Sequence, residues 1–473
     1  MVVVPGIMGS ELRDAATGKH LWGLATSSWY VKAWTHPEGL KALHLTDDEL
    51  EGKTGRIRAT GLLTSTAWTP HLRGAEPYTD LIARIEKCVA HKAAILAFAY
   101  DWRLPVATNA RLLADAARRH LSAWREHPAH IKACAHRVDQ RPARLVFVAH
   151  SMGGLVTRGA LNGPFDSNLK DDTRGVITLG TPFHGAVKAA VILNTGREAP
   201  VPLPRHKLRS LCATMPGLHD LLPQYRCVRD GDDIRHLTPS DVSALGGSAE
   251  LAQNALDFHK SQSHTDLPDH RSVVGISHPT WQNLSMDSGT VTPHFDGGRQ
   301  NTDGSFIRDR HNRLRYFAVH GDETVYQESA EVTELVTPLP YQHGGLAKEE
   351  SALDAVEEII RRDTHMGPPQ GEFGCGLLLP DVVEAGVPWS LQVTEVDSLV
   401  GLVCHIRNLD DPTDAQNPAL GWMDGAIGTQ VVVPAPGLYR VEISTLDGFT
   451  ISQVVMATEP ELTLSESDSR HAP

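Results

Sequence analysis

Short apolar runs alternate with amphipathic stretches from the start of the chain to about residue 365. The apolar runs that predict buried strands are Val2–Val4, Ala94–Phe98, Leu145–Val148, Gly175–Leu179 and Ser272–Ile276. Pro77–Val89 and Asn109–Trp124 instead place apolar residues at helical spacing, with Leu81 and Ile85 on one face of the first. Strands that alternate with helices predict an α/β fold built on a doubly wound parallel sheet.

The pattern changes after residue 365. Met366–Gly374 (MGPPQGEFG) is rich in Gly and Pro and predicts a linker. Beyond it, short strands separated by turns predict a small, sandwich-like all-β domain over residues 375–458. The acidic, Ser-rich residues 459–473 predict a disordered tail. We therefore expect a larger α/β domain over 1–365 and a smaller β domain, which is a candidate for protein or ligand contact.

A long insertion separates two of the predicted strands, over about residues 187–270. It is rich in Pro, His and Leu and contains the stretch LCATMPGLHDLLPQY. An apolar substrate cleft needs additional apolar surface to close it, so this insertion is a candidate lid. A helical cap that only stabilises the core is the alternative.

Composition and charge exclude some classes of binding partner. The 473 residues carry 44 Lys and Arg against 57 Asp and Glu, a net charge of -13, and 41% of them are hydrophobic. This balance argues against nucleic acid, and against binding to anionic membranes through bulk charge. Trp22, Trp29, Trp34 and Trp68 make peripheral membrane contact a candidate, although a tryptophan cluster more often packs a loop onto a core.

No apolar stretch is long enough to predict a transmembrane helix, and no export signal is recognisable, so a cytoplasmic location is expected. The six cysteines include no C-x-x-C pair and are expected to be reduced. His259, His264 and His270 are too irregularly spaced to predict a metal site.

The most informative motif is LVFVAHSMGGL, Leu145–Leu155. An apolar strand runs into A-H-S-M-G-G, and Ser151 stands between that strand and a helix. Such a turn exposes a serine hydroxyl beside backbone N–H groups that can stabilise an oxyanion. The usual G-x-S-x-G signature has glycine where this chain has Ala149, a difference of one methyl group. Ser151 is therefore a candidate nucleophile, although S-x-G-G also occurs at ordinary strand-to-helix turns.

An acid and a histidine follow Ser151 in the order that this elbow requires. The strand-like run Leu314–Val319 leads into HGDETV, which presents Asp322, and PYQHGG places His343 in a glycine-flanked loop. We expect His343 to accept the proton of Ser151 and Asp322 to orient His343. The alternative acids are Asp287, Asp303 and Asp309, which lie in a turn-rich segment.

The oxyanion hole needs two N–H donors. The residue after the nucleophile, Met152, supplies one candidate, and the loop PGIMGS after the first strand supplies Ile7 as the other. This chemistry uses no metal and no organic cofactor, so none is expected.

Six motifs in order give the chain a resemblance to the lecithin:cholesterol acyltransferase family, which includes a lysosomal phospholipase and acyltransferase. They are VPGIMGSEL (4–12), FAYDWR (98–103), AHSMGG (149–154), LGTPFHGA (179–186), GDETV (321–325) and QHGGL (342–346). The resemblance covers about the first 365 residues. It implies an α/β-hydrolase fold with a lid, and transfer of an acyl group from a lipid ester to water or to another hydroxyl. Asp101 and Arg103, in the second motif, are expected to form a buried ion pair rather than to touch substrate.

Together these observations predict a serine-dependent acyl hydrolase or O-acyltransferase that acts on lipid esters, with glycerophospholipids as the first candidate. The alternatives are a triacylglycerol lipase, a carboxylesterase on soluble esters, or a non-catalytic binding protein on a hydrolase scaffold.

Overall fold

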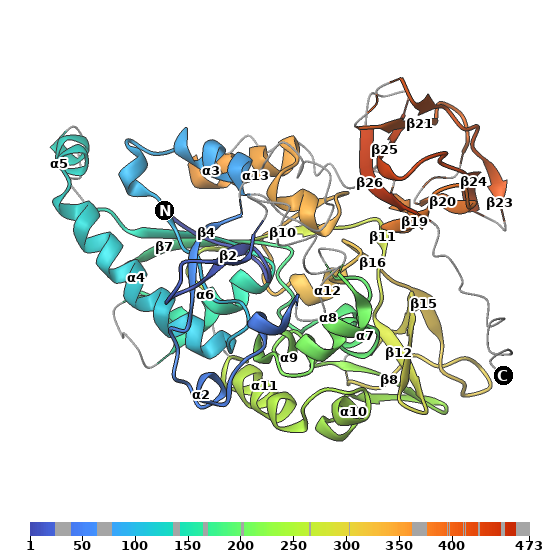
Figure 1. Ribbon diagram of the computed structural model, residues 1–473, viewed down its shortest axis with the longest axis horizontal. Helices are drawn as coiled ribbons and strands as arrows, with labels where there is room; N and C mark the ends of the chain where they lie inside the picture. Colours follow the sequence, from blue (N-terminus) through green and yellow to red (C-terminus); the bar gives the residue numbers. More distant parts are fainter. Residues whose placement is uncertain are drawn as a thin grey trace, which may run out of the picture. The chain divides into compact units, whose positions relative to one another are not determined.

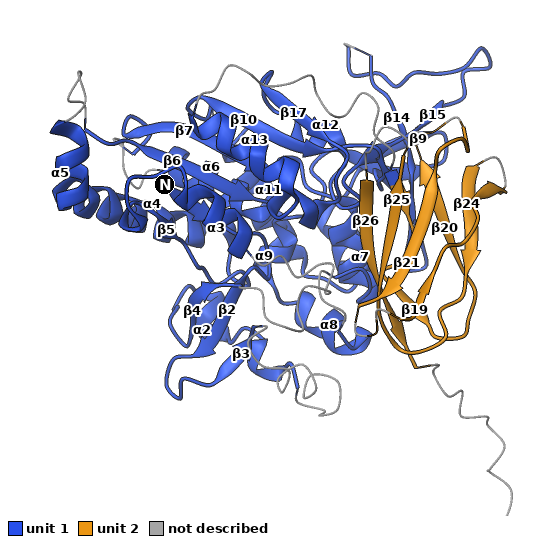
Figure 2. Ribbon diagram, turned by 90° about the horizontal axis from the view of Figure 1, so that it is seen from above, with its two compact units in different colours: residues 1–70, 74–376 blue, residues 71–73, 377–473 orange. Residues whose placement is uncertain are grey.

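A computed structural model divides the chain into two compact units (Figure 2). Unit 1 runs to Gly376 and unit 2 begins at Leu377. The structure describes all residues except 24–38, 64–77, 136–141, 164–168, 200–202, 264–265, 302, 362–375, 395, 397, 410, 412, 424–425, 446–449 and 460–473. The predicted linker and tail therefore lie outside the described residues, apart from Glu459.

Unit 1 is built on a six-stranded sheet in which all neighbours are parallel (Figure 1). In spatial order the strands are β17 (Val336–Leu339), β10 (His270–Gly275), β7 (Thr173–Leu179), β6 (Leu145–His150), β1 (Val2–Val4) and β5 (Leu96–Ala97). Val3 lies opposite Val148 of β6 and Ala97 of β5. The chain leaves β1 toward β5 and returns to β6 on the other side of β1. Open parallel sheets bind ligands at such a reversal, beyond the carboxyl ends of the strands.

Helices cover both faces of this sheet. α3 (Thr79–Glu86) and α13 (Glu350–Arg361) pack on the face that presents Val3 and Val148. α4 (Val106–Glu126) and α6 (Met152–Asn162) lie against each other on the opposite face. Valine and leucine pack on both faces because parallel strands of such a sheet are buried on both sides. The predicted α/β architecture, a parallel sheet with helices on both faces, is confirmed.

The insertion between β7 and β10 contains both helices and strands. Its elements are α7 (Val187–Thr195), α8 (Arg205–Cys212), α9 (Pro216–His219), β8 (Arg226–Asp230), β9 (Asp233–His236), α10 (Pro239–Ala244) and α11 (Ala249–Ser261). The role of this insertion as a lid stays a prediction.

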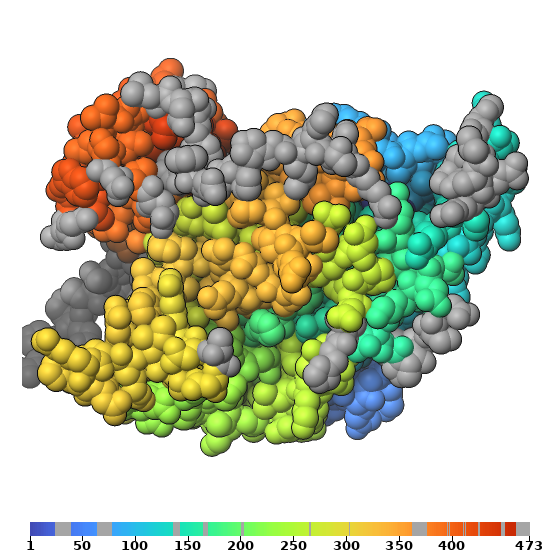
Figure 3. All heavy atoms as spheres, turned by 180° about the vertical axis from the view of Figure 1, so that it is seen from behind, coloured from blue at the N-terminus to red at the C-terminus, as the bar shows by residue number. Residues whose placement is uncertain are grey.

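A second insertion separates β10 from β17. Its elements are β11 (His278–Pro279), β12 (Asn283–Asp287), β13 (Thr290–His294), β14 (Asp296–Gly298), β15 (Tyr316–Ala318), β16 (His320–Gly321) and α12 (Gln327–Ala330). β12 and β13 join β8 and β9 in one sheet, in the order β13-β12-β8-β9. Figure 3 shows the two insertions side by side on one face, the first in green and the second in yellow. Two segments far apart in sequence thus form one layer beside the parallel sheet.

A small sheet of β2 (Ser10–Asp14), β3 (His20–Trp22) and β4 (Ile57–Leu62) follows β1 in the chain. Trp22 is fully buried there, its indole N–H donates to the carbonyl of Met8 at 2.9 Å, and its ring contacts Trp102 edge-on. Trp22 therefore packs a loop onto the core and is not available to a membrane surface. Trp29, Trp34 and Trp68 lie outside the described residues. The remaining short elements of unit 1 are η1 (Lys41–Leu43), α2 (Asp47–Leu50), η2 (Lys92–Ala94), α5 (Pro128–Ala135) and η3 (His343–Ala347).

Unit 2 is all-β in its described residues. One sheet has the order β18-β20-β24-β23 and the other β19-β26-β25-β21-β22. The strands are β18 (Gly376–Leu378), β19 (Val382–Glu384), β20 (Trp389–Thr394), β21 (Val403–Asn408), β22 (Ala415–Gln416), β23 (Gly421–Met423), β24 (Ala426–Val431), β25 (Gly437–Ser444) and β26 (Thr450–Thr458). Alternate residues of β25 and β26 are buried, as expected for strands with one face in a core. Over the described part of the whole chain, none of the helices combines the length and the apolarity that crossing a bilayer requires.

Candidate active site

Ser151 ends β6 and begins α6. Its backbone has φ 53° and ψ −128°, a left-handed conformation that costs an L-residue free energy. The N–H of Ser151 donates to Leu179 O at 2.9 Å, which ties the turn to β7. The sharp turn lifts the side chain off the strand end, and the residue remains 6% exposed.

The glycines after Ser151 allow α6 to lie close to the sheet. A Cβ on Gly153 would stand 2.5 Å from the carbonyl oxygen of Val4, and one on Gly154 would stand 2.1 Å from Thr181 Oγ1. Neither contact is sterically allowed, so both glycines are required for this packing. Ala149, where the usual signature has glycine, is fully buried within the strand.

The structure brings Ser151, Asp322 and His343 together, although they are far apart in sequence. His343 Nε2 lies 2.8 Å from Ser151 Oγ, and His343 Nδ1 lies 2.7 Å from Asp322 Oδ2. His343 begins η3, directly beyond β17, and its side chain is 11% exposed, whereas that of Asp322 is 1% exposed. The hydroxyl, the imidazole and the carboxylate form one hydrogen-bonded row.

The surroundings of Asp322 fix which nitrogen of His343 carries a proton. Asp322 Oδ1 accepts the backbone N–H groups of Thr324 and Val325, at 3.0 and 2.6 Å. The carboxylate thus presents its second oxygen, an acceptor, to His343 Nδ1. His343 must donate from Nδ1, which leaves the lone pair of Nε2 facing the hydroxyl of Ser151.

Asp322 follows β16, a two-residue strand of the second insertion, and not a strand of the parallel sheet. The three alternative acids lie elsewhere and bond locally. Asp287 accepts from Ser288, Asp303 from Ser305, and Asp309 from His311 and Arg313.

The two candidate oxyanion donors lie on segments in contact. α6 begins with Met152, and the close approach of Gly153 to the carbonyls of Val4 and Pro5 places the start of α6 against the loop that holds Ile7. Among the described residues, no hydrogen-bond partner is recorded for the backbone N–H of Ile7 or of Met152. The loop turns at Met8, which has φ 62°.

Gly180 was not singled out from the sequence, yet it lies against the row of polar groups. It has φ 55°, and a Cβ there would stand 2.8 Å from Asp322 Oδ2 and 3.1 Å from His343 Nδ1. The LGTP motif was the signal that could have identified it. Any side chain at this position would displace the carboxylate or the imidazole.

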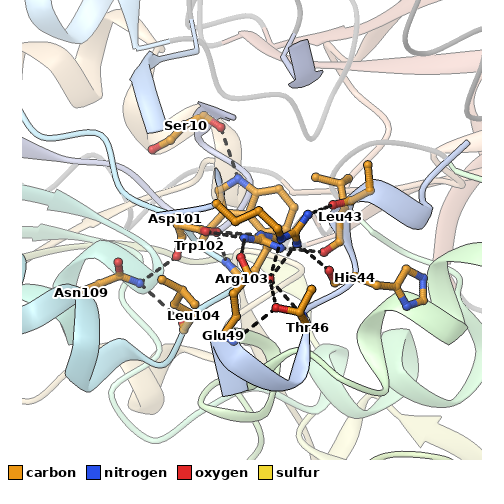
Figure 4. A network of polar contacts seen from close by, with 12 residues as sticks. Ser10, Leu43, His44, Thr46, Glu49, Asp101, Trp102, Arg103, Leu104 and Asn109 are labelled. Atoms are coloured by element: carbon orange, nitrogen blue, oxygen red, sulfur yellow. Dashed lines mark hydrogen bonds and ion pairs between the residues drawn. The ribbon is translucent and has the colours of Figure 1, made fainter. Parts of the chain in front are cut away.

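The D-W-R motif supports the loop after β1 from behind. Arg103 is fully buried and its guanidinium donates to both oxygens of Asp101, at 2.9 and 2.6 Å, and to Glu49 Oε1 at 2.9 Å (Figure 4). Trp102 Nε1 donates to Ser10 O, at the end of that loop, at 3.2 Å. The expected buried ion pair is present, and these contacts make it structural.

The histidines considered for a metal have other partners. His259 Nε2 lies 2.7 Å from Asp220 O, and His270 Nε2 lies 2.9 Å from Thr178 Oγ1. His264 lies outside the described residues. In the part of the chain that the structure describes, no three His, Cys, Asp or Glu side chains cluster as metal ligands. Cys212 and Cys227 are buried free thiols, and burial raises the pKa of each to about 12.

Comparisons with known proteins place this site in a family context. Residues 45–245 match the family "Lecithin:cholesterol acyltransferase". The uncharacterized protein YJR098C of Saccharomyces cerevisiae is 28% identical over 183 residues, a match that takes in 38% of this chain and 23% of the yeast protein. The chain thus corresponds to less than a quarter of the length of that relative.

Three solved structures are similar to this chain at low scores. The Tle4–Tli4 complex gives a TM-score of 0.46 at 16% identity and covers 76% of this chain and 97% of that one. Bacillus licheniformis lipase BlEst2 gives 0.30 at 12% identity, with 76% and 90% covered. Phospholipase PlaB from Legionella pneumophila gives 0.24 at 9% identity, with 96% and 88% covered.

The family match spans the elbow with Ser151 and the D-W-R motif, which are two of the motifs that suggested the resemblance. It ends before Asp322 and His343, so the arrangement of those two residues rests on the geometry above. Residues 45–245 of this chain are therefore similar to the lecithin:cholesterol acyltransferase family.

Proposed function

We propose that this protein is a serine-dependent acyl hydrolase or O-acyltransferase that acts on lipid esters, with glycerophospholipids as the substrate class. The observation that carries the proposal is the row of hydrogen bonds from Ser151 Oγ through His343 to Asp322, with 2.8 and 2.7 Å between the bonded atoms. The match of residues 45–245 to the lecithin:cholesterol acyltransferase family supports an acyl group as the group transferred and a lipid as its donor.

In the proposed reaction, Ser151 Oγ attacks the ester carbonyl while its proton passes to His343 Nε2. His343 then carries a positive charge, which the carboxylate of Asp322 stabilises through Nδ1–H. The negative charge on the former carbonyl oxygen is stabilised by the N–H groups of Ile7 and Met152 and by the N-terminus of α6. Collapse of this intermediate expels the alcohol, which takes the proton from His343 and leaves an acyl ester on Ser151.

Deacylation repeats these steps with a second hydroxyl compound. His343 removes a proton from water, giving hydrolysis, or from an acceptor alcohol, giving transfer. A lid that closes over the acyl-enzyme would exclude water and favour transfer. We assign the insertion 187–270 to this role.

Labelling with a fluorophosphonate tests the nucleophile. We expect the folded protein to form one adduct at Ser151, identified by peptide mass spectrometry, and the Ser151→Ala variant to form none. Ser285→Ala is the matched control, because it removes a hydroxyl that hydrogen-bonds another histidine, His294, away from the site. Absence of an adduct in the folded wild-type protein would favour a binding protein on a hydrolase scaffold.

Substrate class is tested by offering phospholipids, triacylglycerols and simple esters with short and long acyl chains, below and above their micelle thresholds. We expect long-chain phospholipid in micelles to be turned over fastest. A preference for soluble short-chain esters would indicate a carboxylesterase, and a preference for triacylglycerol would indicate a lipase.

A further inference from the structure

A second row of hydrogen bonds reaches the site from behind Ser151. The backbone N–H of Gly6 donates to Tyr78 Oη at 2.8 Å, Tyr78 Oη lies 3.0 Å from His150 Nδ1, and His150 Nε2 lies 3.1 Å from the carbonyl oxygen of His343. Tyr78 and His150 are buried, at 0% and 1% exposure. We call these three bonds the back relay.

The back relay joins the three segments that must meet for the proposed reaction. Gly6 precedes the candidate oxyanion donor Ile7, and His150 precedes the candidate nucleophile Ser151. The far end is the main-chain carbonyl of His343, the candidate base. Tyr78, just before α3, therefore links the loop after β1 to the loop after β17 across the end of β6.

The chemistry of the partners fixes the direction of each bond. A carbonyl oxygen only accepts, so His150 Nε2 must carry the proton in the bond to His343. A neutral imidazole then has a lone pair on Nδ1, which accepts the hydroxyl proton of Tyr78. The oxygen of Tyr78 keeps a lone pair for the N–H of Gly6, so every member has a suitable partner with His150 neutral.

A neutral His150 also suits the proposed mechanism. The imidazole rings of His150 and His343 are 4.9 Å apart between centroids. When His343 takes the proton of Ser151 it becomes a cation, and a second cation at this distance would oppose that step. By donating to His150 Nδ1, the Tyr78 hydroxyl favours the neutral form of His150, which does not oppose the charging of His343.

We propose that Tyr78 and His150 are positioning residues for His343 and for the loop that holds Ile7. They touch no reacting atom, and they act by keeping His343 Nε2 and the N–H of Ile7 in place relative to Ser151 Oγ. The inference rests on the proposed function, because it concerns the same nucleophile and base. Small displacements in such supporting bonds cost large factors in rate.

Three variants separate the bonds of the relay. Tyr78→Phe keeps the ring and removes the hydroxyl. His150→Gln keeps a donor near the position of Nε2, and His150→Asn keeps an acceptor near the position of Nδ1 but has no donor that reaches His343. We expect kcat to fall about 10-fold in Tyr78→Phe with KM changed less than twofold, as for loss of a supporting bond to a catalytic group. We expect His150→Asn to lose at least tenfold more kcat than His150→Gln.

His130→Gln is the matched control. His130 is also buried, and its ring also lies between a backbone carbonyl and a backbone N–H, with Nδ1 at 3.0 Å from Arg125 O and Nε2 at 3.2 Å from Ala143 N. It lies on α5, which Figure 1 places at the far end of unit 1 from the insertions. We expect this variant to lose thermal stability and to keep kcat.

Titration with a fluorophosphonate counts the competent sites in each preparation, so that kcat is compared per labelled serine. The inference would be overturned if Tyr78→Phe kept the wild-type kcat or if the two His150 variants lost kcat equally. A matching loss of kcat in His130→Gln would also overturn it. Failure of the wild-type protein to label at Ser151 would instead overturn the proposed function. If an His150 variant does not fold, the Tyr78→Phe measurement decides alone.

Discussion

Ser151, the candidate nucleophile, has a strained backbone. Its φ of 53° is unfavourable because of the Cβ atom, not because of the hydroxyl. The neighbouring packing maintains the conformation, since α6 lies directly against Val4 and Thr181. The turn that lifts the hydroxyl off the strand end is therefore also the source of the cost to stability.

This origin predicts an unusual order of stability for two inactive variants. Ala is normally more stabilising than Gly by about 0.5–1 kcal/mol within regular structure. At position 151 we expect the reverse, with Ser151→Gly unfolding at a higher denaturant concentration than Ser151→Ala. Denaturation in urea, followed by tryptophan fluorescence, measures the difference. A Ser151→Ala variant that is the more stable of the two would show that the turn is not strained.

The second prediction concerns the bond between Asp322 and His343. Asp322→Asn offers an amide in place of an acceptor-only carboxylate and so favours the wrong tautomer of His343. We expect the acylation rate to fall about 10³–10⁴-fold, with little loss of stability. The rate of p-nitrophenyl ester cleavage provides the measurement, and Asp303→Asn is the control because Asp303 is exposed and bonds only locally. Wild-type activity in Asp322→Asn would reject Asp322 as the acid.

Sequence spacing was sufficient to name Ser151, Asp322 and His343 as candidates, because each stands in a short motif with a local structural signature. Their mutual distances agree with that interpretation, while their catalytic roles stay predictions. Gly180 stands in the LGTP motif, but neither its role nor that of Tyr78 follows from the sequence. Tyr78 has no motif around it, and the position of Gly180 against Asp322 exists only after β7 and the second insertion have packed.

At the scale of elements, the buried charges of the D-W-R motif bear on stability. Burial alone would raise the pKa of Glu49, but hydrogen bonds, led by the one from Arg56, outweigh burial and hold the pKa below its usual value. Glu49 therefore stabilises the fold as a carboxylate, and this contribution is lost as the pH falls through its lowered pKa. Arg103 carries the charge that pairs with it and with Asp101.

We expect Arg103→Ala to lower the free energy of unfolding by about 3–5 kcal/mol, because it leaves the buried carboxylate of Asp101 without this cation and leaves Glu49 with Arg56 alone. Chemical denaturation measures the loss. Arg313→Ala is the control: its ion pair with Asp309 is exposed, so we expect little change in stability. Similar losses in the two variants would contradict the assignment of Arg103 as a structural cation.

Asp220, whose buried carboxyl group lies against the start of α4, should make stability fall as the pH rises, the opposite of Glu49. Burial raises the pKa of Asp220 from 3.8 to about 7, although Asp220 Oδ2 accepts the N–H of Val106 at 2.7 Å, which acts to lower it. Between pH 3.8 and about 7, the folded protein therefore keeps a proton on Asp220 that the unfolded chain has released. Stability from this group is full below about pH 4 and is lost as the pH rises to about 7.

Asp220→Asn removes this titration and keeps an acceptor for Val106. We expect the variant to melt at the same temperature as the wild type near pH 4, and several degrees higher at pH 8. Differential scanning calorimetry across this range measures the change. Asp303→Asn, at an exposed site, serves again as the control, and a difference in melting temperature that does not grow with pH would contradict the prediction.

The main elements of the parallel sheet follow from the sequence, since buried parallel strands are continuous apolar runs. The sheet β13-β12-β8-β9 was not predicted. Its strands are short and form one antiparallel pair in each insertion, β8 with β9 and β12 with β13, and the two pairs meet only through β8 and β12. Pairing between distant segments leaves no periodic pattern in either one.

At the scale of the whole molecule, the chain divides into an α/β unit and an all-β unit, each with buried hydrophobic residues of its own. We expect calorimetry of the full chain to show two unfolding transitions, because units with separate cores unfold independently unless their interface is large. The assignment is made with a fluorophosphonate-labelled sample, in which only the transition of unit 1 should shift. A single transition that shifts as a whole would show that the two units unfold cooperatively. Contact of unit 2 with a protein or ligand stays a prediction.

The position of β1 has a consequence for biosynthesis. Val2–Val4 lies between β5 and β6, whose pairing residues begin at Leu96 and Phe147. A ribosome therefore releases the three valines long before either neighbour exists, and the emerging chain must keep them from aggregating in the meantime. We expect nascent chains arrested before residue 145 to be bound by chaperones and sensitive to protease, and chains extended past β7 to become resistant.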